Sequence, residues 1–171
     1  MSRTDMFALK PISAGSVVGA LGRAERYRLL NEPSEAESIC LDILAVDAEN
    51  ELASISLVLA LTDQIPQDAR AFDKALAAAA QLKTPYDRTY YTGIAWERRA
   101  KARHHRSGQG GRHDVYEWIV KALRLFEEAS ASRAAGNDDA ILRWNACVRY
   151  LERHKELAAR VEESPEPIMS E

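Results

Sequence analysis

The chain has 171 residues, of which 46% are hydrophobic, and is therefore long enough for one domain with a sizeable buried core. Its formal net charge is only −3, so the overall charge indicates no class of partner. No segment has the roughly 18 apolar residues of a membrane-spanning helix or the pattern of a signal peptide. We therefore expect a cytoplasmic protein with no membrane partner.

The composition favours helices. The chain has only 8 glycines and 6 prolines, and β-branched residues seldom alternate with polar ones, so the pattern typical of strands is weak. Its two cysteines, Cys40 and Cys147, form neither a disulfide framework nor a zinc-ligand pattern. We expect both to be buried thiols that serve packing.

The predicted helices follow one another with short breaks. Residues 1–15 are expected to be a flexible leader, and a first helix at about 16–31 ends before Pro33, because a residue that precedes proline avoids the helical conformation. Pro33 begins a second helix, which ends near Asp47, and Asn50 caps a third helix that reaches about residue 63. Further helices are expected at about 68–82, 85–105, 113–132 and 137–160, followed by a disordered acidic tail at 161–171.

Two of these helices share a spacing of small and large side chains. The second helix contains Ala36-x3-Cys40-x2-Ile43 and ends in the sequence VDAEN, and the sixth contains Ala122-x3-Phe126-x2-Ala129. In the preceding helices, Tyr27 lies nine residues before Ala36, and Gly93 and Trp96 form a Gly-x2-aromatic element. These spacings resemble those of the tetratricopeptide repeat (TPR) family. The chain departs from that pattern at Ala48, where the family has proline, and in the weak pattern of residues 51–84.

The resemblance implies an all-α, right-handed superhelix of antiparallel helix pairs, a TPR-like α-α solenoid of about seven helices. Its units would lie at about 17–50, 51–84 and 85–136, with a terminal helix at 137–160. The family's concave groove is lined by the first helix of each pair. Carried over by position, the partner-binding residues would be Leu21, Glu25, Arg28, Ile55, Leu59, Thr62, Tyr90, Ile94 and Glu97.

The residue types at these groove positions indicate which kind of ligand the groove would bind. Family members that clamp the terminal carboxylate of a peptide use Lys and Asn there, whereas this chain has Leu21, Glu25, Ile55 and Leu59. The resemblance therefore implies a more apolar ligand, such as a helix or the protein's own terminal segment.

The third unit is about seventeen residues too long for the repeat, because Gly93 and Ala122 are 29 residues apart. We expect a helical hairpin whose tip, HHRSGQGGRHD at 104–114, projects beyond its neighbours. Residues 98–112 contain six cations and no acid, whereas residues 29–69 contain nine acids and no Lys or Arg. We call the cations of the hairpin the basic prong; they are Arg98, Arg99, Lys101, Arg103, Arg106 and Arg112. It suits an acidic partner, a nucleic acid, or the acidic end of a second copy.

Other chemistry at the tip has weaker support. His104 and His105 are adjacent and so point in different directions on a helix; with His113 they leave a metal site open, but no HExxH or Cys pattern supports one. SGQGGR lacks the frame of a phosphate-binding loop, and a solvated turn is the remaining interpretation. The chain also lacks a Gly-x-Ser-x-Gly motif and a dinucleotide fingerprint.

We therefore expect a protein that is not an enzyme and carries no cofactor: a scaffold that binds another protein or peptide through its groove, its basic prong or both. Nucleic-acid or anionic-ligand binding by the prong is the alternative, and a metal-dependent enzyme the lesser one. Self-association through the acidic and basic ends is a further option.

Overall fold

The computed structural model describes residues 7–106 and 111–158, and all regular structure within them is helical. After the short 3-10 helix η2 (Ala14–Ser16) come seven α-helices. They are α1 (Val17–Leu29), α2 (Pro33–Val46), α3 (Glu51–Gln64), α4 (Arg70–Ala80), α5 (Pro85–Arg106), α6 (Arg112–Ala131) and α7 (Asp139–Arg153). The all-α prediction is confirmed. Residues 1–6, 107–110 and 159–171, which hold parts of the expected leader, tip and tail, lie outside the described residues.

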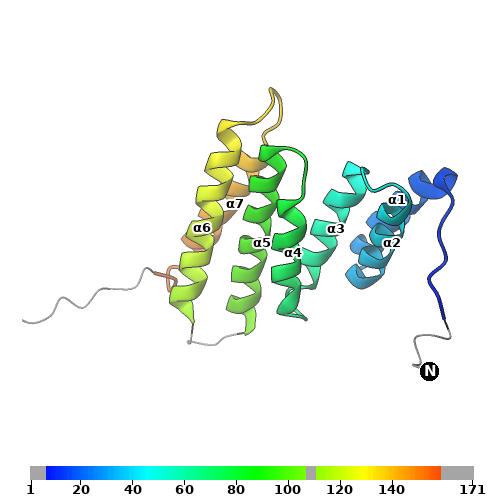
Figure 1. Ribbon diagram of the computed structural model, residues 1–171. Helices are drawn as coiled ribbons and strands as arrows, with labels where there is room; N and C mark the ends of the chain where they lie inside the picture. Colours follow the sequence, from blue (N-terminus) through cyan, green and yellow to red (C-terminus); the bar gives the residue numbers. More distant parts are fainter. Residues whose placement is uncertain (1–6, 107–110, 159–171) are drawn as a thin grey trace, which may run out of the picture.

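The helices stand side by side in a row, from α1 and α2 at one end to α6 and α7 at the other (Figure 1). Each helix packs against the next one in the chain, and α1, α3 and α5 also contact one another in succession. These three helices begin at residues 17, 51 and 85, a constant spacing of 34 residues. The third pair breaks the regularity, since α5 and α6 have 22 and 20 residues whereas α1 and α2 have 13 and 14.

Local sequence explains the helix ends. Pro33 occupies the first turn of α2, where its missing N–H costs no hydrogen bond. The side chain of Asn50 accepts a hydrogen bond from the backbone N–H of Ala53 and so caps α3. The prediction for the last helix was too long, because α7 ends at Arg153. His154 has φ −117° and ψ 64°, and the chain from there to Ala158 is a turn that folds back toward α6.

The core changes character along the row. Between α1, α2 and α3 it contains many small side chains, with Ala24, Ala36, Cys40 and Ala60 fully buried beside Ile43. Between α5, α6 and α7 it is built from large ones, which include Ile94, Ile119, Phe126 and Tyr150. The helix pair α5–α6 closes over Gly93, where a Cβ would lie 2.7 Å from Cε1 of Phe126. Glycine at this position therefore lets the Phe126 ring pack directly on the α5 backbone.

Candidate functional site

The predicted groove residues divide into two groups by exposure. Glu25 is exposed, and Leu21, Arg28, Ile55 and Leu59 are half-buried. The remaining four, Thr62, Tyr90, Ile94 and Glu97, are buried. The predicted groove positions on α1 and part of α3 are therefore accessible at the surface, whereas those on α5 belong to the core.

A cleft of about 510 Å³ lies where the C-terminal ends of α1 and α3 meet the middle of α5. Its floor holds a shared ion pair: Asp63 accepts a 2.8 Å hydrogen bond from Nε of Arg28 and a 2.7 Å one from an amino group of Arg98. These three residues are 35 positions apart in succession, close to the spacing of the helix starts. The other lining residues are Glu25, Leu29, Asn31, Pro66 and Gln67.

Two cations of the basic prong are paired with acids of the same chain. Arg98 belongs to the cationic segment and Asp63 to the acidic one, so the two oppositely charged segments meet within the fold. Lys101 pairs with Glu97, with 2.5 Å between Nζ and Oε1. Two of the six prong cations are therefore neutralised by acids of the same chain.

Three other prong arginines converge on a second cleft, of about 300 Å³. The guanidinium of Arg99 lies 4.1 Å from the ring centre of Phe72 and 4.3 Å from that of Trp118, so cation–π contacts hold it in place. Arg103 and Arg106 line the same cleft and are exposed, and Asp114 is the one acid there. Arg112, the sixth cation, is half-buried and lies outside this cleft lining.

A buried carboxylate lies between α5 and α7. The side chain of Glu97 is 1% exposed, and its Oε2 lies 3.6 Å from an amino group of Arg143 without a hydrogen bond. Burial of a charge is tolerated only when partners compensate it, and here Lys101 and Arg143 do so from two sides. Glu97 therefore ties α5 to α7, and it is not open to a ligand.

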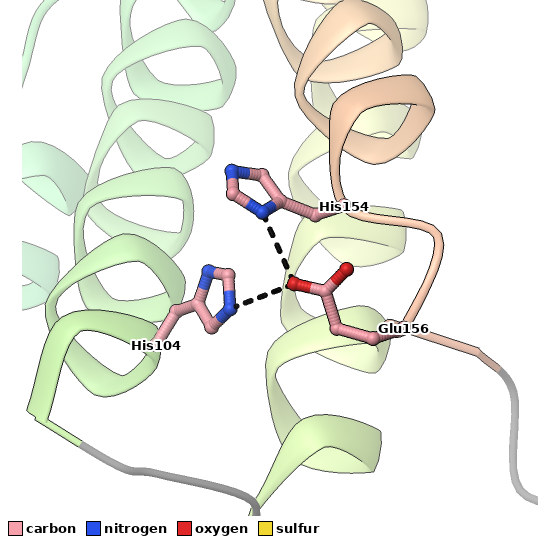
Figure 2. A group of neighbouring side chains, drawn as sticks. All are labelled: His104, His154 and Glu156. Atoms are coloured by element: carbon pink, nitrogen blue, oxygen red, sulfur yellow. Dashed lines mark hydrogen bonds and ion pairs between the residues drawn. The ribbon is translucent and has the colours of Figure 1, made fainter.

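A cluster of two imidazoles and a carboxylate lies further along the same pair of helices (Figure 2). His104 comes from the last turn of α5, and His154 and Glu156 come from the turn after α7. Oε1 of Glu156 lies 3.4 Å from Nε2 of His104 and 3.1 Å from Nδ1 of His154. The three ligand atoms all lie within 4.8 Å of one another, so this set can hold a metal ion.

The other histidines of the predicted tip do not join this cluster. Nδ1 of His105 contacts the backbone oxygen of Lys101 at 2.6 Å, and Nδ1 of His113 contacts that of Ala158 at 3.0 Å. Sequence reasoning proposed His104 with these two neighbours and missed His154 and Glu156. The reason is the expected helix through residue 160, which would have pointed the two side chains in different directions. The His-x-Glu spacing of residues 154–156 was the only available signal.

The thiols are poor nucleophiles in this fold. Burial raises the pKa of Cys40 to about 11 and that of Cys147 to about 12, and the charge of Glu97 adds to the rise at Cys147. Both side chains are fully buried. Because the thiolate is the reactive species, neither cysteine is suited to nucleophilic catalysis at neutral pH.

Comparison of the chain with protein-family models, with curated protein sequences and with solved structures finds no match. Among the helices that the structure describes, none is both long and apolar enough to cross a membrane.

Proposed function

We propose that the protein is a TPR-like helical scaffold that binds a segment of another protein through the 510 Å³ cleft. The observation that carries the proposal is the constant 34-residue spacing of α1, α3 and α5, together with the contacts between these helices. A regular stack of helix pairs presents equivalent helices side by side and so forms an extended binding surface. The TPR-like superhelix is part of this proposal.

The lining of the cleft indicates the kind of segment. Leu29 is 82% exposed and stands at the rim, and Arg28 and Arg98 keep 21% and 34% of their side chains exposed beside Asp63. A peptide with an apolar side chain next to an acidic one would cover Leu29 and add a carboxylate to the two guanidinium groups. Aspartate already occupies part of their hydrogen-bonding capacity, so the acidic contact serves orientation more than affinity.

The test compares two exposed leucines. A photo-crosslinking residue that replaces Leu29 should capture a partner in the cells that produce the protein. A crosslinking residue that replaces Glu25 should capture the same partner, and the additional substitution Leu29→Glu should abolish that capture. The matched control is Leu142→Glu on α7, because Leu142 is also exposed, at 64%, but lies outside the cleft. Equal capture by the wild type, Leu29→Glu and Leu142→Glu proteins would contradict the proposal.

The second candidate function is anion binding at the 300 Å³ cleft, favoured by the convergence of Arg99, Arg103 and Arg106 on one surface. Two cations with exposed side chains beside a third held on aromatic rings suit phosphate groups. Binding of single- and double-stranded oligonucleotides should weaken steeply as salt rises. Arg103→Ser with Arg106→Ser should abolish it, whereas Arg23→Ser with Arg26→Ser on α1 should leave it unchanged; no binding at low salt would reject this candidate.

A further inference from the structure

We propose that His104, His154 and Glu156 form a binding site for a divalent transition-metal ion, with Zn²⁺ as the ion that the donor atoms fit best (Figure 2). Two imidazole nitrogens and one carboxylate oxygen are ligands that zinc commonly takes, and three protein ligands leave a coordination position for water. The proposal uses residues of neither cleft, so it does not depend on the proposed function.

The distances suit one ion between the three groups. Metal–ligand bonds of about 2.0–2.1 Å in a tetrahedral site place neighbouring ligand atoms about 3.3 Å apart. The Glu156 oxygen lies 3.4 Å from the His104 nitrogen and 3.1 Å from the His154 nitrogen. Because all three ligand atoms lie within 4.8 Å of one another, rotations of the side chains can bring them onto a shared ion.

A contact outside the ligand set orients His104. Its Nδ1 is hydrogen-bonded to the hydroxyl group of Tyr150, which leaves Nε2 facing Glu156. In the tautomer that binds a metal through Nε2, Nδ1 carries the proton and its N–H donates a hydrogen bond to the tyrosine oxygen. The ring is further held by edge-on packing against Tyr150 and His154, with ring centres 5.8 Å and 4.7 Å away.

The backbone of the turn is also held in place. The N–H of His154 bonds the carbonyl groups of Tyr150 and Leu151, so His154 is fixed to the last turn of α7. Leu157 is buried in the large core, and the carbonyl group of Ala158 contacts His113 of α6. Both ends of the segment that carries His154 and Glu156 are thus anchored, which lowers the conformational cost of assembling the site.

The partial exposure of the three side chains is compatible with a bound ion that keeps a water ligand. The side chains of His104, His154 and Glu156 are 18%, 35% and 38% exposed, so the group sits at the surface with the His104 ring partly covered. Structural zinc sites are closed by four protein ligands, whereas sites with an open position bind and acidify water. The arrangement is therefore of the open kind.

The ion would join parts of the chain that are about 50 residues apart in sequence, the end of α5 and the turn after α7. Binding to the folded state alone raises the free energy of unfolding. Zn²⁺ should therefore raise the melting temperature of the wild-type protein, and the rise should be absent when a ligand is removed.

The experiment uses the full chain without a histidine tag, treated with a chelator and titrated with Zn²⁺ in a calorimeter. The wild type should bind one ion per chain, and His104→Ala, His154→Ala and Glu156→Gln should each weaken the affinity at least tenfold. His105→Ala is the matched control, because His105 is the neighbouring, exposed imidazole on the same helix; this variant should bind like the wild type.

Two results would overturn the proposal. One is no Zn²⁺ binding by the wild type at micromolar concentrations, and the other is undiminished one-to-one binding by all three ligand variants, which would place the ion elsewhere. Circular dichroism without metal checks that each variant is folded; Glu156→Gln, at an exposed position, keeps the shape of the side chain if the histidine variants unfold. Co²⁺ substitution adds a spectroscopic readout, since its visible spectrum should change in His104→Ala and not in His105→Ala.

Discussion

The two ends of the helix row achieve their packing by different means. In α1–α3, alanines such as Ala24, Ala36 and Ala60 let the helices approach closely, and no charge is fully buried among the described residues there. In α5–α7, aromatic rings fill the core, and the carboxylate of Glu97 is buried between two cations. Small residues allow the helices of α1–α3 to approach closely, whereas the longer helices α5 and α6 have additional surface, which large and polar side chains occupy.

The sharpest test of this difference is Phe126→Ala. The Phe126 side chain is fully buried and packs on Gly93 and Tyr90, so the substitution should lower the free energy of unfolding by about 3–5 kcal/mol. Urea denaturation followed by circular dichroism measures the change. Hydrogen exchange should show faster opening in α5–α7 than in α1–α2. A uniform increase along the row would mean that the two ends unfold as one unit.

Two glycine substitutions make the next comparison. Gly93→Ala places a methyl group against the Phe126 ring and should destabilise the protein by about 1–3 kcal/mol. Gly22→Ala, in the exposed interior of α1 with no atom within 4 Å of the added Cβ, should stabilise it by about 0.5–1 kcal/mol.

Thermal unfolding of the two variants gives opposite shifts if the packing differs as described. In the double variant Gly93→Ala, Phe126→Leu, the smaller side chain removes the clash, so the effect of the alanine should be largely lost. An equal cost of Gly93→Ala in both backgrounds would show that the Phe126 ring is not the cause.

The ion pairs of Glu97 and Asp63 can be compared by removing one cation from each. Arg143→Met leaves the buried Glu97 with Lys101 alone and should lower the free energy of unfolding by about 1–3 kcal/mol. Arg28→Met leaves Asp63, which is 16% exposed, paired with Arg98 and should cost about 0.5 kcal/mol. Denaturation in low and high salt distinguishes the two variants, because Asp63 is 16% exposed and Glu97 only 1%, so the interactions of Asp63 should be more sensitive to screening.

Cys40 and Cys147 allow the packing of α1–α3 and of α5–α7 to be compared, with the smallest expected effect on stability. Raised pKa values mean that the folded protein keeps the thiol protons that the unfolded chain releases near pH 9. Their contribution to stability is therefore complete below pH 9 and is lost as pH rises toward about 11 for Cys40 and about 12 for Cys147.

The reactivity of the two cysteines toward a thiol reagent measures how well each one is protected. Both cysteines should be unreactive at pH 8 in the folded state and reactive in urea, and Cys40 should react at lower pH than Cys147. The variants Cys40→Ala and Cys147→Ala assign the signals. Rapid labelling of Cys147 at pH 8 without urea would contradict the tight packing of α5–α7.

The order of the helices could be predicted from the sequence, because the residues that begin and end a helix act locally. Pro33 and Asn50 act through neighbours a few residues away, and the predicted helix order is confirmed. Ala36, Ala122 and Ala129, which belong to the spacing pattern, are fully buried. The extra length of the third pair is likewise visible in the spacing of Gly93 and Ala122. The groove positions carried over from the TPR resemblance were less informative, because Tyr90, Ile94 and Glu97 are buried in the fold, with Tyr90 and Ile94 in the core cluster that α5 shares with α6 and α7.

Only the tertiary structure decided which charges and imidazoles meet. Asp63 with Arg28 and Arg98, Glu97 with Arg143, and His104 with His154 and Glu156 are pairs separated by 35 to 52 residues. Their side chains come together because helices pack at fixed register and because α7 ends at Arg153, where the chain turns. By itself, the sequence determined an all-helical chain with an over-long third pair. The packing of α5 beside α3, α4 and α6, and against the turn after α7, determined the clefts and the cluster of His104, His154 and Glu156.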